Sequence, residues 1–230
     1  MKAVELASIL NKLSVHILLV NETSINPNCP IYLPIESFEP LTYEHKPGNG
    51  FKGGVIIYVH KSISKKTKPY HLKLDVPLAQ ACGIEIEGTK IISMYRSPSQ
   101  EREDFEIWTE KLHKILKMEN TVVIGDLNLH VDWFEMMEEE KYYRPALDAI
   151  LISQSSQYVN KPTYLRAKNP RVLDVVLTKM NNIIHNTQVI SDWEADGVDH
   201  LPVLTRMNLN CNTLQRAEIY SRKSKNIQTC

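Results

Sequence analysis

Apolar residues recur at helical spacing in three segments of the chain. Positions 4–13, 105–116 and 146–151 each place apolar side chains three or four residues apart, which is the spacing of one helix face. The first segment carries Lys and Glu between its apolar positions and has no small-residue cleavage site. We therefore interpret it as an amphipathic helix and not as a signal peptide.

Short apolar runs between these helices predict β-strands. They lie at 15–20, 53–59, 121–124, 173–178 and 201–207. The segment 83–87 alternates apolar and charged residues, and Gly88-Thr89 turns it back into a further strand at 90–95, as in a hairpin. Because hairpins and strand–helix units alternate along the chain, we expect an α/β or α+β domain with layered, mixed sheets.

The chain is long enough for one large domain. Its 230 residues include no apolar run close to the roughly 18 residues that a membrane span needs, so no membrane association is expected. From position 208 onward the sequence is polar and has no clear period. We expect the domain to cover 1–207 and the remainder, 208–230, to be a tail or linker stub.

Charge and cysteine content leave the partner open. The chain has 27 Lys and Arg against 27 Asp and Glu, and a neutral total neither supports nor excludes nucleic acid, because a local basic groove can coexist with it. The cysteines at 29, 82, 211 and 230 form no C-x-x-C pair, which disfavours a zinc knuckle or redox motif. Reduced thiols of an intracellular protein are the simpler interpretation.

Acids, an amide and a histidine follow the ends of the predicted strands. These residues are Glu22, Asp126, Asn128, Asp174, Asp199 and His200. Strand ends at one sheet edge can gather polar groups from distant parts of a chain, and clustered carboxylates repel unless a cation compensates them. Magnesium prefers such oxygen ligands, and a histidine beside a carboxylate suits a general base. Each residue alone also fits a loop cap, so the hypothesis rests on their order.

That order resembles the endonuclease/exonuclease/phosphatase superfamily. The matching segments run from Ile17 to Val203 and read ILLVNETSI, GGVIIYV, MYRSP, VVIGDLNLH, PTYL, RVLDVVLT and VDHLPVL. Within the superfamily the chain is most similar to the apurinic-endonuclease-like domain of non-LTR (LINE-type) retrotransposons, a branch that Tyr95 and the Ser-Pro after Arg96 favour. The resemblance implies a four-layer α/β/β/α sandwich of two mixed sheets, as in DNase I.

The resemblance also implies roles for individual residues. The catalytic set is His200, Asp126, Asn128, Asp174 and Tyr95. The metal-binding residues are Glu22 and Asp199, and the substrate contacts are Asn128, Arg96 and Thr163. In this scheme Asp174 orients His200, which acts as general base, and the cofactor is Mg²⁺ with Mn²⁺ as a substitute.

The activity implied is Mg²⁺-dependent hydrolysis of a DNA phosphodiester by an endonuclease. The product 3′-hydroxyl can prime reverse transcription at the target site. The expected partners are DNA and a reverse transcriptase domain of the same polyprotein, and the expected location is intracellular, in the nucleus. Lysines 61, 65, 66 and 68 could follow a phosphate backbone, although a solvated loop explains them equally well.

Three departures from the family keep alternatives open. First, the family begins with a strand that ends in Asn, and this chain starts at the helix after it. Second, Val198 replaces a usual Ser. Third, Val172 replaces a usual Ser or Arg. One alternative is a phosphatase or phospholipase of the same superfamily, because fold does not settle substrate. The other is a catalytically degenerate remnant that acts as an interaction domain.

Overall fold

A computed structural model describes residues 3–23, 34–44, 53–166, 170–191 and 199–209, and the backbone of 217–223. Cys82 is a buried free thiol, whereas Val198 and the other three cysteines lie outside the described residues. No helix in the described ranges is long and apolar enough to cross a membrane.

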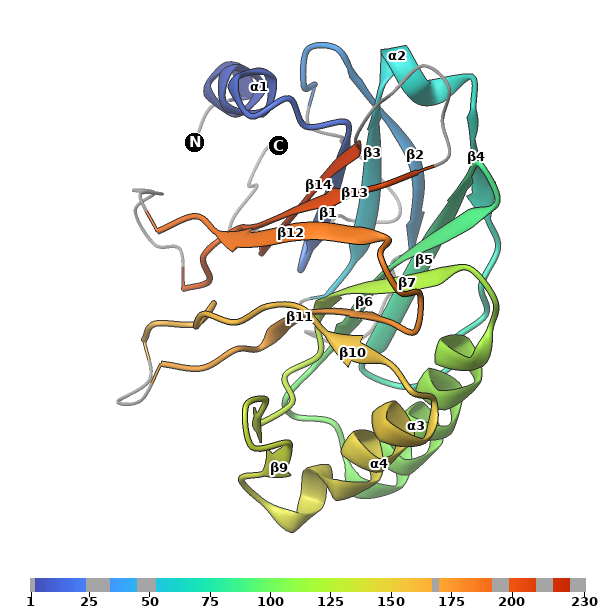
Figure 1. Cartoon of the computed structure of the whole chain (residues 1–230), viewed down its shortest axis with the longest axis vertical. Helices are drawn as coiled ribbons and strands as arrows, with labels where there is room; N and C mark the ends of the chain where they lie inside the picture. The colour runs from blue at the N-terminus through green and yellow to red at the C-terminus, as the bar shows by residue number, and fades with distance from the viewer. Residues whose placement is uncertain are drawn as a thin grey trace.

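The described strands form two six-stranded sheets and a small hairpin (Figure 1). The first sheet has the order β12-β13-β14-β1-β3-β2, with bounds Ile184–Val189, Val203–Met207, Ala217–Lys223, Ile17–Asn21, Val55–His60 and Phe38–Glu44. The second has the order β10-β11-β7-β6-β5-β4, with bounds Ser156–Gln157, Asp174–Thr178, Thr121–Asp126, Thr89–Arg96, Ala79–Ile86 and Thr67–Tyr70. The hairpin joins β8 (Val131–Asp132) to β9 (Met137–Glu138).

Strand alternation builds the core between the two sheets. In β1, Ile17 and Leu19 join one apolar cluster, which also contains Val122 and Ile124 of β7. Successive side chains of a strand point to opposite faces, so the same strands supply a second set of apolar residues to the outer layers. Both faces of β1 and β7 are buried, which explains why these strands are continuous apolar runs.

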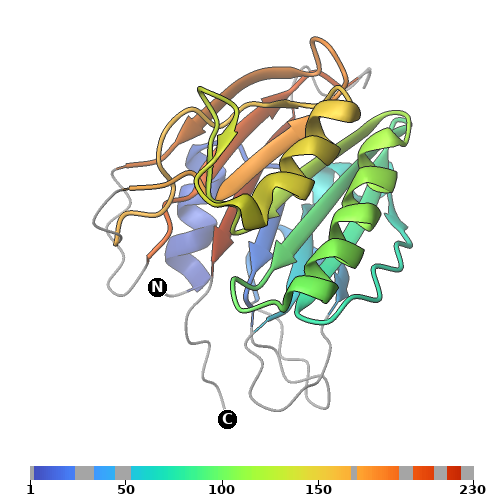
Figure 2. The same ribbon diagram turned by 90° about the horizontal axis from the view of Figure 1, so that it is seen from below.

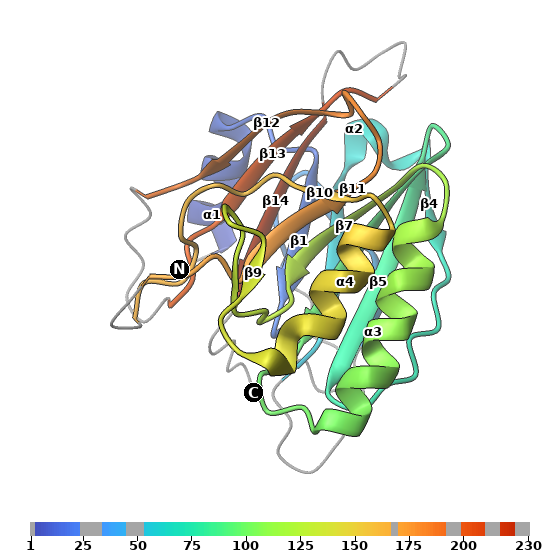
Figure 3. The same cartoon turned by 60° about the horizontal axis from the view of Figure 1, so that its bottom comes forward.

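Helices cover the two outer faces. They are α1 (Ala3–Lys12), α2 (Lys61–Ser64), α3 (Arg102–Lys117) and α4 (Arg144–Ile152), with a 3₁₀ turn at Lys141–Tyr143. Leu6 and Leu10 of α1 pack with Leu18 of β1. Phe105 of α3 and Leu147 of α4 belong to the cluster on the outer face of the second sheet. Figures 2 and 3 show α3 and α4 side by side on that sheet, with α1 on the far side of the molecule.

This arrangement confirms the α/β/β/α sandwich of two mixed sheets, because each sheet contains parallel and antiparallel pairs. The helix expected at 105–116 begins three residues earlier, at Arg102, with Glu103 and Asp104 in its first turn, where acids favour the helix dipole. It ends at Lys117, one residue beyond the expected end.

One strand comes from the segment that the sequence assigns to a tail. β14, at Ala217–Lys223, lies between β1 and β13, parallel to the first and antiparallel to the second. Five residue pairs join it to each neighbour. A parallel neighbour of β1 normally comes from a strand–helix–strand unit, and here the far end of the chain supplies it.

Candidate active site

Two carboxylates face each other across neighbouring strands of the second sheet. β7 ends at Asp126 and β11 begins at Asp174, and the antiparallel register pairs these two residues directly. Both side chains are buried. Like charges placed opposite one another destabilise a sheet, so this pair requires a compensating group.

His200 lies against both carboxylates. Its Nδ1 is 2.7 Å from Oδ2 of Asp174, and its Nε2 is 4.0 Å from Oδ2 of Asp126. The imidazole is buried and its ring lies 5.0 Å from that of Tyr164. With Nδ1 protonated, the hydrogen bond to Asp174 fixes the ring and leaves Nε2 as the basic nitrogen. The structure therefore brings together three residues that the sequence predicts to be catalytic.

Thr163 links the backbone at Asp174 to the backbone beside His200. Its Oγ1 accepts the backbone N–H of Leu173 and of Asp174, both at 3.1 Å. Its carbonyl oxygen accepts the N–H of Leu201 at 2.7 Å. Thr163 is fully buried, and these bonds position the backbone at Asp174 and beside His200, while its predicted substrate contact stays a prediction.

Two residues around the end of β7 have positive φ angles, one in the strand and one in the loop that follows it. Gly125 has φ +151°, and a Cβ there would lie 1.9 Å from the carbonyl oxygen of Met94, so only glycine fits. Asn128 has φ +48° and donates its N–H to Asp126 Oδ1 at 3.1 Å. Its side-chain Nδ2 donates to the carbonyl of Arg96 at 2.8 Å, which fixes the buried amide beside the catalytic carboxylate.

Arg96 supports the loop that follows β7. It is fully buried, and its Nε and Nη2 donate to the carbonyl oxygens of Leu127 and Asn128 at 2.8 and 2.6 Å. The guanidinium lies 5.0 Å from the ring centre of Phe105, and burial lowers the pKa of Arg96. Arg96 is thus buried and bonded to backbone carbonyls, which supports the loop, and its predicted substrate contact stays a prediction.

Glu22 and Tyr95 join the two sheets at the same end of the sandwich. Tyr95 Oη donates to Glu22 Oε1 at 2.5 Å, and Glu22 follows β1 with φ +53°. Burial, then Glu22, then Asp126 raise the pKa of Tyr95 far above its ordinary value. The phenol therefore stays protonated and acts as a hydrogen-bond donor. Because both acids act on Tyr95, Glu22 and Asp126 both lie close to it.

Asn21 is a second contact between the sheets that the sequence did not indicate as functional. Its Oδ1 accepts the hydroxyl of Ser93 at 3.1 Å, and its Nδ2 lies 3.5 Å from the carbonyl of Met94. A Cβ on Gly125 would also lie 3.0 Å from that Nδ2. Asn21 thus places the end of β1, and with it Glu22, beside the loop of Asp126. Its position before an acid at a strand end was the only available signal.

Asp199 occupies a different environment from the one predicted for it. Its Oδ1 lies 2.5 Å from Nε of Arg166. Among the described residues, the acids and histidines close enough to share one ion are Asp126, Asp174 and His200, whose ligand atoms lie within 4.8 Å of one another. The metal-binding roles of Glu22 and Asp199 stay predictions.

The donor set suits a divalent cation. Two buried carboxylates lie in cross-strand register and bring their oxygen atoms together, and hard cations such as Mg²⁺ and Mn²⁺ prefer carboxylate oxygen. Glu22 adds a third carboxylate at the same end of the sandwich. The residues present therefore fit a divalent metal site.

Comparison with known proteins agrees with this geometry. The family described as "Endonuclease-reverse transcriptase" matches residues 89–204, just over half of the 230-residue chain. The match covers the strands that carry Tyr95, Asp126 and Asp174, and also His200, which precedes β13. No curated protein sequence matches the chain.

Solved structures share the fold at low sequence identity. The endonuclease domain of TRAS1, a telomere-specific non-LTR retrotransposon, superposes with a TM-score of 0.64 and 16% identity, over 90% of this chain and 92% of that one. An AP endonuclease from Archaeoglobus fulgidus gives 0.64 and 15%, over 88% and 92%. A 3′-5′ exonuclease from Neisseria meningitidis gives 0.57 and 14%, over 90% and 96%. The chain belongs to the endonuclease-reverse transcriptase family of the endonuclease/exonuclease/phosphatase superfamily.

Proposed function

We propose that this protein is a Mg²⁺-dependent endonuclease that hydrolyses a DNA phosphodiester. The observation that carries the proposal is the buried pair Asp126 and Asp174 together with His200. The His200 imidazole is hydrogen-bonded to Asp174 and lies 4.0 Å from Asp126. A facing pair of buried acids weakens a sheet, and a hydrophobic pair there would stabilise it better. Its presence therefore favours chemistry over a purely structural role, and family membership favours a nuclease.

His200 is the general base in this proposal. Asp174 accepts Nδ1–H, so Nε2 is available to take a proton from water as the water oxygen attacks phosphorus. The bond between phosphorus and the 3′-oxygen breaks. That oxygen takes up a proton to become the 3′-hydroxyl, and the phosphate stays on the 5′ side. Tyr95 stays protonated and is the hydrogen-bond donor nearest the leaving oxygen. Asn128 and Asp126 orient the water and phosphate.

The metal site is proposed at the carboxylates of Glu22 and Asp126, with Asp199 as the predicted further ligand. Bound Mg²⁺, or Mn²⁺ as a substitute, would neutralise charge that develops on the phosphate oxygens. Titrating Mn²⁺ by electron paramagnetic resonance tests the ligands separately from catalysis. Glu22→Gln and Asp126→Asn should each weaken Mn²⁺ binding. The pairing of Asp199 with Arg166 predicts a smaller effect for Asp199→Asn.

The activity is tested with supercoiled plasmid and Mg²⁺. We expect conversion to the open circular form, abolished by EDTA and by His200→Asn. An absence of nicking together with phosphate release from a small phosphoester would support the phosphatase alternative. An absence of both would support the degenerate remnant.

Two further proposals concern context. A 3′-hydroxyl at a nick is a primer, so a reverse transcriptase domain of the same polyprotein is the partner we propose, with the nucleus as the location of the target DNA. The lysines at 61–68 support DNA binding less than the sequence indicated. Lys66 and Lys68 lie near Glu87 and Glu85, at 3.9 and 3.1 Å, on or beside β4 at the sheet edge.

A further inference from the structure

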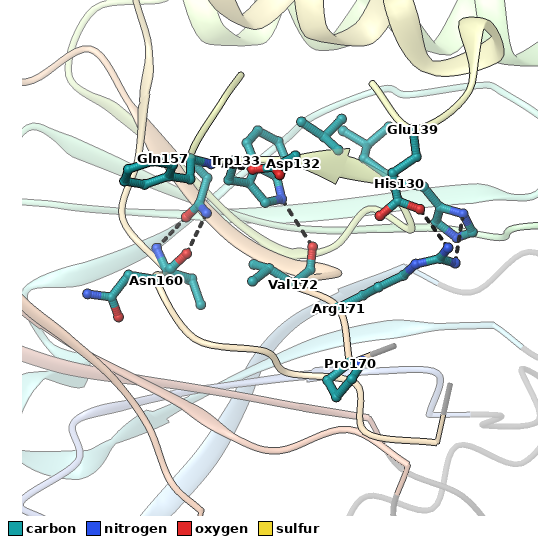
Figure 4. A pocket seen from close by; sticks show the side chains of 13 residues that line it. His130, Asp132, Trp133, Glu139, Gln157, Asn160, Pro170, Arg171 and Val172 are labelled. Atoms are coloured by element: carbon teal, nitrogen blue, oxygen red, sulfur yellow. Dashed lines mark hydrogen bonds and ion pairs between the residues drawn. The ribbon is translucent and has the colours of Figure 1, made fainter. Parts of the chain in front are cut away.

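A cavity of about 370 Å³ is lined by segments that adjoin the candidate active-site residues along the chain (Figure 4). It is lined by residues of three segments, at 129–134, 157–160 and 170–172, and by Glu139. Each one continues from a residue of the active site: the first follows Asn128, the second precedes Thr163, and the third precedes Asp174. The cavity is therefore connected along the chain to Asn128, Thr163 and Asp174, whereas His200 comes from a separate segment.

An aromatic side chain forms a fixed wall of the cavity. Trp133 donates its Nε1–H to the carbonyl of Val172 at 3.1 Å, so its indole is anchored at one edge. Beside it, Phe134 is 92% exposed. Oδ1 of Asp132 accepts the backbone N–H of Phe134 and of Glu135, at 2.9 and 3.0 Å. This turn holds the backbone that carries both rings at the mouth of the cavity.

The charged groups that line the cavity are Arg171, Glu139 and Asp132, and each has a partner. Nη2 of Arg171 lies 2.6 Å from Oε2 of Glu139, and Nη1 lies 3.1 Å from Nδ1 of His130. Burial and the charge of Arg171 lower the pKa of His130, so near neutral pH its Nδ1 accepts from the guanidinium. Nε of Arg171 is buried and has no hydrogen-bond partner among the described residues. The cavity thus offers donors and an aromatic face to a neutral heterocycle, where a phosphate would meet Glu139 as well as Arg171.

We propose that this cavity binds one nucleobase of the DNA strand next to the scissile phosphate, stacked on Trp133 beside Arg171. The proposal rests on the proposed function, because it assigns a specificity subsite to the same active site. Stacking of a base on an aromatic side chain contributes roughly 1–3 kcal/mol. Trp133 contributes through binding of the base and takes no part in the chemistry.

The test removes the nucleobase from the DNA and, separately, the indole ring of Trp133 from the protein. A duplex with a mapped nick is made with an abasic analogue at each position flanking the scissile bond, one position per duplex. For the wild type we expect kcat/KM to fall about tenfold or more at one position, the factor that corresponds to 1.4 kcal/mol. Trp133→Ala should lose the same factor on the intact duplex, mainly in KM. It should also be insensitive to base removal at that position.

Three variants separate stacking from folding. Trp133→Phe keeps an aromatic face and should retain most of the sensitivity. Phe134→Ala changes a side chain that is almost wholly exposed, so it should fold normally and raise KM by a smaller factor. Ile152→Ala alters an exposed apolar residue of α4 outside the cavity lining and should behave as the wild type.

The outcomes distinguish this proposal from the proposed function. If the wild type nicks DNA but Trp133→Ala responds to base removal exactly as the wild type does, the subsite is wrong and the endonuclease stands. If the wild type does not nick, the subsite is tested by binding alone, with 2-aminopurine at the flanking positions. A fluorescence change lost in Trp133→Ala would support the subsite, and identical signals from both proteins would overturn it.

Discussion

The candidate catalytic group and the cavity are connected along the chain through Asn128, Thr163 and Asp174, yet they differ in burial and in the origin of their hydrogen bonds. Asp126, Thr163 and His200 are buried, and most of their hydrogen bonds come from the backbone of adjacent strands or from each other. In the cavity, Trp133 is half-buried and Phe134 projects into solvent. A reaction needs fixed geometry, which burial and strand ends provide. A contact that selects among substrates needs an accessible face, which a hairpin provides.

The largest difference between the two regions should appear when the proposed general base, His200, is replaced. His200→Asn keeps a polar side chain but has no group that can take the proton, and general bases typically contribute roughly 10²–10⁴-fold. We expect single-turnover nicking to fall by that range, against about tenfold for cavity variants. His185→Asn, at an exposed position of β12, is the matched control. Equal losses for His200→Asn and the control would contradict the assignment.

The next prediction concerns the stability that buried Arg96 gives to the loop at Leu127 and Asn128, in contrast to an exposed arginine. Arg96→Met leaves three buried carbonyls, of Leu127, Asn128 and Ser97, without their donor. Buried polar groups that lose a partner cost about 1–3 kcal/mol each, so urea unfolding should show a loss of about 3 kcal/mol or more. Arg102→Lys alters an exposed pair with Glu106 and should change stability by less than about 1 kcal/mol. Similar values for the two variants would show that Arg96 does not hold the loop.

A smaller effect is expected at Thr163. Thr163→Val has nearly the same shape but cannot accept the N–H groups of Leu173 and Asp174. The loss should be about 1–3 kcal/mol of stability, with a fall in kcat because Asp174 and His200 move. Thr163→Ser retains the hydroxyl and should recover most of kcat. If Val and Ser variants nick at the same rate, Thr163 is not a positioning residue.

The smallest effect should be the pH dependence that His130 adds to stability. Burial, then Arg171, lower the pKa of His130 in the folded protein, so the unfolded chain binds its proton more readily. Its contribution to stability is therefore complete above the ordinary histidine pKa of about 6.5 and is lost as the pH falls below it. His130→Gln should flatten the decline in urea midpoint between about pH 7 and pH 5. An unchanged decline would contradict this shift.

The sequence predicted most of the fold, because apolar periodicity is a strong signal where both faces of a strand are buried. The runs that became β1, β7 and β11 were visible for this reason. β14 was not, since its sequence AEIYSRK is largely polar and only its pairing with β1 and β13 makes it a strand. The polar tail that the sequence indicated thus contains a central strand of the sheet.

Motif order predicted that Asp126, Asp174 and His200 lie together, whereas it did not reveal the surroundings of Arg96 and Thr163. Arg96 and Thr163 were expected at the substrate because both are polar residues in motifs. Their burial depends on the packing of α3 and on segments more than ten residues away, which local pattern does not reveal. The cavity was missed for a similar reason. Trp133, Asn160 and Arg171 are far apart in the sequence and meet only through the fold.

The most direct measurement of the central claim is nicking of supercoiled plasmid in Mg²⁺ by the wild type, His200→Asn and Asp126→Asn, followed by extension of the nick with a DNA polymerase. The account predicts open circles for the wild type alone, abolished by EDTA, and immediate extension, since the 3′ end carries a hydroxyl. Equal nicking by all three proteins would contradict it, as would no nicking by a folded, Mg²⁺-loaded wild type. Nicks that extend only after phosphatase treatment would contradict the proposed cleavage of the P–O3′ bond.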